Sequence, residues 1–577
     1  MENKKHYFVL VLALISALLV FYQAGRVAPL IDYSYQIENA YRISIGDFPF
    51  RDFELTLAPG TYLITALLMR LGGNSFNLDW LIIYACVSQI LMILLTYYIV
   101  RKIYSLDEIT ISSLILIMVF AGYAIYPFPI YNGDVALFML LALSYLTRVI
   151  SSERKSIYSY FLIGVLIALP TFFKQNVGSI FLVSILGILF LTSLWDKKVL
   201  SLKQFCIVFL GALLPFVVFI AVLQSQETLN QAIFQLFEHP GKIRKPLAMA
   251  IAVVSSYFSY SAMSMYVLFI IPIFTLLVIP MEKDSRDDLL VLSPILLGTV
   301  VYVISNYFLG IPPYGTQILS IWHVVTILSM IFVGIGIYQF RKYRNISLFK
   351  TLFPLVPILT AHGAFVSQGV SGSSLHMEAL LVLMSASVLA GILSISHSVK
   401  WNNLIISIGL VLSAFFAAYA HNNIRMSFID LRGELNTSRT NFRLGNIIAT
   451  NGPWLPQMEE LLAFTEANIP KNEKVAFFPG EDPFFFLSGR TPYQRCLLFN
   501  ATNCSQTTED ILSELLKNKI KWVIIKRSFQ CPAGFDLPNW VSLLGEDKIP
   551  TYYTLEATSD YYYVFKFSSS KLSTEVR

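Results

Sequence analysis

The sequence predicts an α-helical membrane protein that crosses the bilayer many times and ends in a small α/β domain. Three observations lead to this fold class. Of the 577 residues, 55% are hydrophobic and only 14% are charged, and the mean hydropathy is +0.63. A soluble enzyme has about a quarter charged residues, so the composition excludes that class. Apolar runs of transmembrane length recur as far as residue 420, where the pattern changes.

Each apolar run of about 17 to 25 residues is long enough to cross a hydrocarbon core of about 30 Å as a helix. The first run lacks a small-residue cleavage site, so we interpret it as a retained anchor and not as a secretory signal. The sequence contains about thirteen such runs, at residues 8–24, 78–101, 108–126, 131–149, 156–172, 175–194, 203–223, 254–280, 288–308, 316–340, 349–367, 373–395 and 402–420.

The distribution of lysine and arginine predicts the orientation, because positive charge resists translocation. Alternate loops, on the same side as the N-terminus, are rich in these residues and are therefore cytosolic. The opposite loops are nearly free of them, apart from Lys174 and the group Lys242, Arg244 and Lys245. With an odd number of spans, the region after residue 420 lies outside the cytosol. We expect a multi-pass protein of the cell (plasma or inner) membrane.

The sequence divides into two predicted domains. Residues 1–420 form the transmembrane domain, whose first outer loop covers about 25–77, and residues 421–577 form an extracytoplasmic α/β domain. Amphipathic helix patterns and short β-strand patterns alternate in the second domain. At roughly 130 to 150 residues, this domain is large enough to bury its own core.

Cysteine usage in the second domain fits an oxidising compartment. Cys496, Cys504 and Cys531 lie there, whereas Cys86 and Cys206 lie in predicted spans. A disulfide such as Cys496 with Cys504 is one reading, and buried unpaired thiols are the other.

The first outer loop is about fifty residues long and holds the strongest candidate for chemistry. Asp32 stands where the first span ends, and residues 33–45 form a predicted amphipathic helix in the interface. A carboxylate at this boundary is partly desolvated, which suits a general base with a raised pKa. The alternative role is a helix cap. The loop also contains four further acidic residues: Glu38, Asp47, Asp52 and Glu54.

Two more candidates lie at the outer ends of predicted spans. Asp134 begins the fourth span among apolar neighbours, where a carboxylate is costly and therefore a functional candidate. Capping its helix or pairing with a lysine is the structural alternative. Lys174 lies in the short connection between the fifth and sixth spans. It is either a phosphate contact or a side chain that reaches up to the interface.

The fourth outer loop violates the charge rule. Lys242, Arg244 and Lys245 lie beside the bilayer and suit an anionic lipid head group or a lipid-linked phosphate, although a solvated basic turn is the alternative. Further titratable residues are predicted in this loop and at the outer ends of later spans: Glu238, His239, His362, His376 and Glu378. None of the histidines has metal-ligand spacing of the H-E-x-x-H type, so the sequence predicts no defined cofactor and leaves a divalent metal as a minor alternative.

The acidic and basic candidates thus lie on the same, non-cytosolic side of the membrane. That orientation is predicted from other residues, the lysines and arginines of the cytosolic loops. Two carboxylates beside a cationic patch suit transfer from a phosphate-linked donor. A carboxylate deprotonates the acceptor hydroxyl while cations stabilise the departing phosphate.

Several short motifs resemble the membrane-embedded GT-C glycosyltransferases, especially the branch with protein O-mannosyltransferases and the lipid A aminoarabinose transferase. They are Asp32, Asp47-Phe-Pro-Phe-Arg-Asp52, Pro59-Gly-Thr-Tyr-Leu-Ile-Thr-Ala, Asn132-Gly-Asp134, Leu169-Pro-Thr-Phe-Phe-Lys174 and Pro483-Phe-Phe-Phe-Leu-Ser-Gly-Arg490. The resemblance implies that Asp32 is the catalytic base and Asp134 a second acidic residue, and that Lys174 and the basic loop bind phosphate. Many relatives place a second acidic residue directly after the first, where this chain has Tyr33.

The predicted function is an inverting glycosyltransferase that moves a sugar from a polyprenyl-phosphate donor to a lipid, glycan or protein acceptor outside the cytosol. Its partners would be the donor, the acceptor and membrane lipids, with no nucleic acid. A transporter or flippase of a lipid-linked sugar is the alternative, and it predicts charges in the middle of spans, where the sequence has few. A non-catalytic scaffold is a third reading, in which Asp32 and Asp134 are dispensable.

Overall fold

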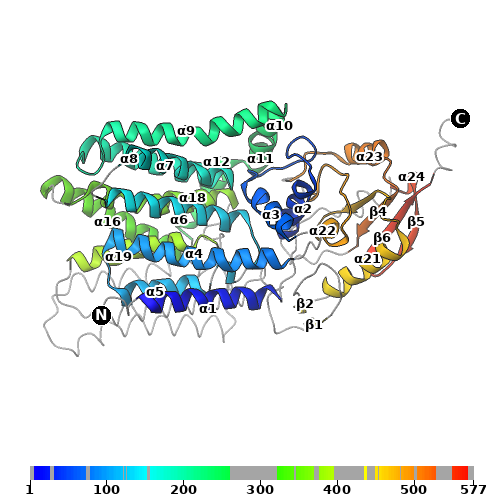
Figure 1. Cartoon of the computed structure of the whole chain (residues 1–577), viewed down its shortest axis with the longest axis horizontal. Helices are drawn as coiled ribbons and strands as arrows, with labels where there is room; N and C mark the ends of the chain where they lie inside the picture. Colours follow the sequence, from blue (N-terminus) through cyan, green and yellow to red (C-terminus); the bar gives the residue numbers. More distant parts are fainter. Residues whose placement is uncertain are drawn as a thin grey trace.

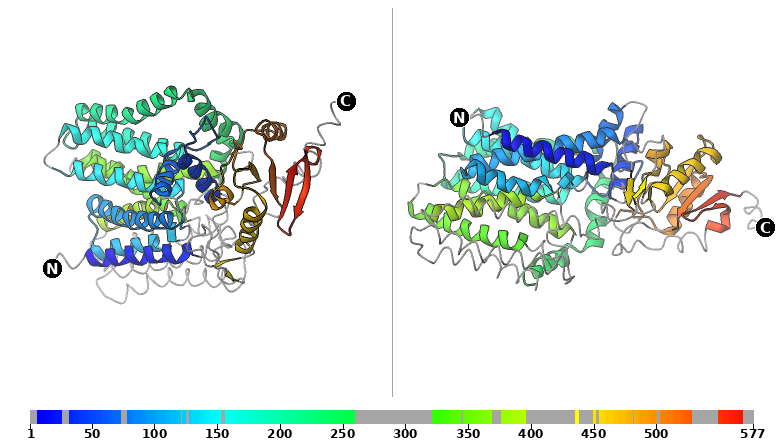
Figure 2. Two further views of the ribbon diagram at one scale, coloured as in Figure 1. Left: turned by 45° about the vertical axis from the view of Figure 1, so that its right-hand side comes forward. Right: turned by 90° about the horizontal axis from the view of Figure 1, so that it is seen from below.

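The computed structural model consists of a bundle of long helices with a mixed α/β domain at one end (Figure 1). It describes residues 6–25, 32–72, 78–259, 321–368, 376–395, 435–437, 449–451, 454–527 and 549–568, apart from positions 121, 125–126, 153–155, 344–345, 481 and 500–502 within them. Both views of Figure 2 show the helices running side by side, with the α/β domain beyond their ends. We call this end of the bundle the domain-facing end.

Most bundle helices match the predicted spans where the structure describes them, but α12 ends at Ser256, two residues after the predicted start of the span 254–280. Seven of the described helices are long and apolar enough to cross a membrane, which confirms an integral membrane protein. The bundle comprises α1 (His6–Ala24), α4 (Asp79–Tyr104), α5 (Glu108–Val119), α6 (Tyr131–Ile150), α7 (Ile157–Ala168) with η3 (Leu169–Phe172), α8 (Gln175–Trp195), α9 (Leu202–Ser225), α12 (Pro246–Ser256), α16 (Ile321–Tyr343), α17 (Leu348–Leu352), α18 (Leu355–Gln368) and α19 (Glu378–Ile395). The predicted spans 288–308 and 402–420, and most of 254–280, fall outside the described residues, so the number thirteen stays a prediction.

Small residues and buried amides hold the bundle together, as expected where lipid offers no hydrophobic driving force. At the contact of α7 with α9, a Cβ on Gly164 would lie 2.0 Å from the carbonyl oxygen of Val208. Only glycine therefore permits this approach. Between α1, α4 and α5, the Gln89 amide donates to Ser16 Oγ at 3.0 Å and to the Met118 carbonyl at 2.8 Å.

The loop after α1 folds into two helices, α2 (Asp32–Ile45) and α3 (Gly60–Leu71), which lie between the bundle and the α/β domain (Figure 1). We call this segment, residues 32–72, the first loop. The prediction of a helix over 33–45 is confirmed. Its surroundings differ from the prediction, because nearly every residue of α2 after Asp32 is buried. The α/β domain covers the face that we expected to lie in the membrane interface.

The α/β domain contains a four-stranded sheet in the order β3-β4-β6-β5. Its strands are β3 (Val475–Phe478), β4 (Trp522–Lys526), β5 (Tyr553–Thr558) and β6 (Tyr562–Phe567), and its helices are α21 (Trp454–Asn468), α22 (Phe484–Ser488), α23 (Thr508–Lys517) and α24 (Ile549–Tyr552). β3 pairs with β4 in parallel, and the other neighbours are antiparallel. A separate two-stranded ladder joins β1 (Leu435–Thr437) to β2 (Ala449–Asn451). The prediction of a C-terminal α/β fold is confirmed.

The predicted disulfide between Cys496 and Cys504 is present, with Cα atoms 5.6 Å apart. It closes a loop beside the first loop of the bundle. Cys86 and Cys206 are free thiols, and Cys531 falls outside the described residues. The disulfide agrees with an oxidising compartment for this domain.

A fully buried ion pair connects the sheet to the helices of the domain. Lys526 Nζ donates to Asp482 Oδ2 at 2.8 Å, and the two side chains are 1% and 0% exposed. The indole of Trp454 donates to the other oxygen of Asp482 at 2.8 Å. Both carboxylate oxygens are therefore satisfied, which a buried charge requires.

We predict that Lys526→Met strongly destabilises the α/β domain, because it leaves Asp482 charged and buried without its cation. Removing one partner of a buried pair costs about 3–5 kcal/mol, which corresponds to a fall on the order of 10 °C in the thermal midpoint of a domain this size. Lys521→Met is the matched control, since Lys521 is 46% exposed in its ion pair with Glu473 and such pairs contribute at most about 1 kcal/mol. Tryptophan fluorescence of the purified full chain on heating measures both. Equal midpoints for the two variants would contradict the prediction.

Candidate functional site

Asp32 lies at the domain-facing end of the bundle, as the first residue of α2. Its side chain is exposed, and the hydroxyl of Tyr131 donates a long hydrogen bond of 3.4 Å to its Oδ2 atom. Tyr131 is the first residue of α6. The contact therefore joins the start of the first loop to the start of a bundle helix, and it leaves the carboxylate accessible.

Lys174 points to the same tyrosine from a different helix. It immediately precedes α8, and its side chain is only 3% exposed. The ammonium group donates to Asn132 Oδ1 at 2.6 Å and lies 5.0 Å from the centre of the Tyr131 ring. Among the described residues, both of these partners are neutral. A buried cation whose partners are neutral is a strong attractor for an anion.

Arg244 is the third charged group around Tyr131. Its guanidinium donates to the Ser367 carbonyl at 2.9 Å, which anchors the end of α11 (His239–Arg244) to α18. The charge of Arg244 acts on both Lys174 and Tyr131, and the charge of Asp32 acts on them as well. The structure thus brings Asp32, Lys174 and Arg244 together. Lys174 and Arg244 repel one another, and a phosphate between them would remove that repulsion.

The structure divides the basic group of the fourth loop. Arg244 is half-buried in the site, whereas Lys242 and Lys245 are exposed. Lys245 adopts a left-handed backbone conformation (φ 44°) that separates α11 from α12. Only one of the three predicted phosphate ligands therefore joins Lys174.

Asp134 lies one helical turn further into α6 than Tyr131, and it is fully buried. Its Oδ1 atom accepts hydrogen bonds from Tyr84 at 2.7 Å and from Tyr123 at 3.2 Å. The cap position of α6 is Ile130, so Asp134 is not the cap of its helix. Neither structural alternative from the sequence, a cap or a lysine pair, describes this residue. It is a buried carboxylate held by two tyrosines, one helical turn from Tyr131.

Two further acidic candidates have structural contacts. Glu38 is buried against the α/β domain, where it accepts from the backbone N–H of Phe486 at 3.1 Å. Burial raises the pKa of Glu38 from its ordinary value of 4.5 to about 8. Asp52 closes a turn by accepting from the Phe48 N–H at 2.7 Å, and the hydrogen bond from Arg51 lowers its pKa. The structure places neither carboxylate beside Lys174.

The other titratable candidates are spread over the domain-facing end. Glu238 is exposed, and the His239 ring packs 6.0 Å from that of Phe234. His362 bridges two elements, with Nδ1 against the Ile358 carbonyl at 2.7 Å and Nε2 against the Tyr257 hydroxyl. His376 is buried with its ring 5.1 Å from Tyr123, next to the tyrosines that hold Asp134. The structure also places the buried Glu378 beside Gly122, the residue before Tyr123, so His376 and Glu378 both lie near the tyrosines around Asp134.

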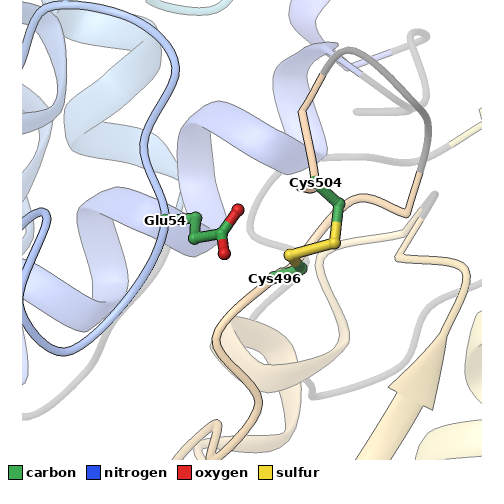
Figure 3. A group of neighbouring side chains, drawn as sticks. All are labelled: Glu54, Cys496 and Cys504. Carbon is green, nitrogen blue, oxygen red and sulfur yellow. A yellow bond between two sulfur atoms is a disulfide. The ribbon is translucent and has the colours of Figure 1, made fainter. Parts of the chain in front are cut away.

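One group of side chains among the described residues has the spacing of a metal site, namely Glu54, Cys496 and Cys504 (Figure 3). The sulfur atoms of the two cysteines are bonded to each other, so they offer no thiolate to a metal. Glu54 accepts from the N–H and the hydroxyl of Ser505, each at 2.9 Å. This group is therefore a structural junction between the first loop and the α/β domain.

Sequence reasoning missed the tyrosines that organise the site: Tyr131, Tyr84 and Tyr123. Tyrosine is common at both membrane interfaces, so its presence near a span end carries little information. The available signal was position. Tyr131 lies three residues before Asp134, which places both on one face of the helix.

The family model of the dolichyl-phosphate-mannose-protein mannosyltransferases matches residues 57–223, a segment that contains Asp134 and Lys174. This match confirms the resemblance to GT-C glycosyltransferases for that segment. The solved structures similar to this chain include ArnT from Cupriavidus metallidurans bound to undecaprenyl phosphate, with 12% sequence identity, 98% of each chain covered and a TM-score of 0.44. No curated protein matches the chain.

We predict that the stability of the contact between α2 and the α/β domain decreases as the pH rises from about 5 to about 9. The folded-state pKa of Glu38 is about 8, above the ordinary value of 4.5. The folded protein therefore binds more protons between these values, so this contribution to stability is complete at low pH and is lost as the pH rises through 8. The thermal midpoint of Glu38→Gln should lack this pH dependence.

Glu466→Gln removes an exposed carboxylate of α21 and is the matched control. Its thermal midpoint should follow the pH dependence of the wild type. If the thermal midpoint of Glu38→Gln depended on pH as the wild type does, another titratable group would be responsible.

Proposed function

We propose that this protein is an inverting glycosyltransferase that moves a sugar from a polyprenyl-phosphate donor to an acceptor hydroxyl. The observation that carries the proposal is the arrangement around Tyr131. The exposed carboxylate of Asp32 accepts a hydrogen bond from the Tyr131 hydroxyl. Lys174 is buried, its described hydrogen-bond and ring partners are neutral, and its ammonium group lies against the Tyr131 ring. The charge of Arg244 also acts on Tyr131. A base and an anion site thus occur together, as a transfer from phosphate requires.

In the proposed reaction, the acceptor oxygen attacks the anomeric carbon of the donor sugar from the face opposite to the phosphate. Asp32 takes the proton of that hydroxyl as the new C–O bond forms. The bond between the anomeric carbon and the phosphate oxygen breaks, and its electron pair leaves with the lipid phosphate. Lys174 and Arg244 stabilise the charge that develops there. One displacement of this kind inverts the anomeric configuration.

The remaining candidates have supporting roles in this proposal. Asp134 and its two tyrosines form a second acidic centre behind Tyr131, which positions the reacting groups. Lys242 and Lys245 are exposed beside α12 and suit the anionic head groups of membrane lipids.

Two further observations support the donor class and the side of the membrane. The matching family is described as using a mannosyl group linked to dolichyl phosphate, which is a polyprenyl-phosphate donor. The disulfide between Cys496 and Cys504 suits an oxidising compartment, in agreement with the orientation predicted from the basic loops. We therefore propose that the reaction takes place on the extracytoplasmic side.

We predict that Asp32→Asn reduces release of the lipid phosphate by a factor of about 10² to 10⁴, the usual contribution of a general base. The assay supplies purified protein with a panel of polyprenyl-phosphate sugars and measures the phosphate product. Glu466→Gln is the control and should retain full activity. Normal turnover by Asp32→Asn would remove the proposed base. Movement of a labelled donor across vesicles without bond cleavage would favour the flippase.

We predict that Lys174→Gln weakens binding of the donor, because it removes a positive charge that would contact the donor phosphate. Charge-assisted hydrogen bonds contribute about 1.5–3 kcal/mol, so KM for the donor should rise by roughly 10- to 100-fold. Lys242→Gln removes an exposed charge from the neighbouring loop and should change KM by less than about threefold. Steady-state kinetics with varied donor measures both. Equal KM values for the two variants would contradict the assignment of Lys174 to the phosphate.

A further inference from the structure

A cavity opens at the junction of three segments that are far apart in the sequence. Its volume is about 380 Å³, within the range of small-ligand sites. The first loop contributes Glu54 to its lining. The segment after α9 contributes Asn230, Gln231, Phe234 and Gln235, and the α/β domain contributes Arg495. The site around Tyr131 does not include any of these residues.

The floor of this cavity is fixed by hydrogen bonds between the segments. Gln235 Oε1 accepts from the Leu55 N–H at 2.9 Å, and the Glu54 N–H donates to the Arg495 carbonyl at 3.0 Å. The Glu54 carboxylate is held by Ser505. Gln235 and Glu54 are both buried. The polar groups of the floor therefore have fixed positions, which distinguishes a preformed site from an accidental surface hollow.

The rim of the cavity has a different character. The side chains of Asn230, Gln231, Phe234 and Arg495 are exposed. Phe234 begins a π-helical turn, η4 (Phe234–Glu238), which follows α10 (Leu229–Ile233). Turns of this kind are rare and occur frequently at functional sites, because they re-aim side chains. Here the turn leaves Phe234 exposed and directs Gln235 inward to the first loop.

The chemistry of the lining points to a ligand rich in hydroxyl groups. Amides, a carboxylate and a guanidinium offer both donors and acceptors, and Phe234 offers an apolar face. The lining contains one acidic side chain, Glu54, and one basic side chain, Arg495, so it carries no net charge and does not favour an anion as the Lys174 site does. We propose that this cavity binds a neutral glycan portion of the acceptor.

This inference rests on the proposed function, and the fold connects the two sites. Asp32 lies one helical turn before Tyr35, and the Thr56 N–H approaches the Tyr35 hydroxyl at 3.5 Å, two residues from Glu54. Burial is the main cause that raises the pKa of Tyr35 to about 12, with smaller contributions from the charges of Glu54 and Asp32. Both carboxylates therefore lie within electrostatic range of one phenol. A glycan in the cavity would place its neighbouring hydroxyls on the side of the proposed base.

The test is direct binding of neutral oligosaccharides to the full chain in nanodiscs prepared without sugar detergents. Maltotriose, cellotriose and triacetylchitotriose serve as probes in saturation-transfer NMR titrations. We expect at least one to bind, with Kd raised about fivefold or more by Asn230→Ala with Gln231→Ala, since two hydrogen bonds of about 0.5–1.5 kcal/mol each are lost. Gln224→Ala, an exposed glutamine at the end of α9, should leave Kd unchanged.

Three results would overturn the inference. These are no binding of any trisaccharide, the same Kd in the double variant and the wild type, or binding of a serine- and threonine-rich peptide in place of the sugars. The proposed function is tested separately. Asp32→Asn should bind the trisaccharide with wild-type Kd while lipid phosphate release is lost, so failure of the reaction and failure of the glycan site give different results.

Discussion

The buried guanidinium of Arg42 holds the first loop in the shape on which the candidate site depends. It is paired with Asp47 at 2.6 Å, donates to the carbonyls of Gln494 at 2.6 Å and Asp52 at 3.1 Å, and stacks over the Phe53 ring. A charge with 4% exposure is stable only when its donors are satisfied. The turn after α2 and the α/β domain must therefore assemble around it, and Asp32 is positioned at the other end of the same helix.

Two buried lysines, one in the bundle and one in the α/β domain, differ in the charge of their partners. Around Tyr131, the described hydrogen-bond and ring partners of Lys174 are neutral, so neither of them compensates its charge. In the α/β domain, Lys526 is equally buried, but Asp482 compensates its charge. The same residue type is thus a ligand-binding candidate in one place and a structural element in the other. Burial alone does not separate these roles, whereas the charge of the partner does.

Much of the fold was predictable because apolar length and helical periodicity are local properties. The predicted start of α8 at residue 175 and the helix over 33–45 agree with the structure for this reason. Long-range contacts were not predictable. The burial of α2, the selection of Arg244 over Lys242 and Lys245, and the role of Glu38 all depend on which segments meet in space. Asp32, Asp134 and Lys174 were predicted as candidates because polar groups at span ends are costly. Tyr131, which contacts Asp32 and Lys174, has no such cost and was not predicted.

The contact between Arg42 and Gln494 also dictates an order of assembly. The two residues are 452 positions apart, so the ribosome synthesises nearly all the bundle before the partner of Arg42 exists. Domains form progressively during synthesis, and α2 has to wait for the last one. A nascent or truncated chain can contain every side chain around Tyr131 and still lack the support that fixes Asp32. The candidate site around Asp32 is therefore the last part of the fold to be completed, so under the proposed function only a fully translated chain would be active.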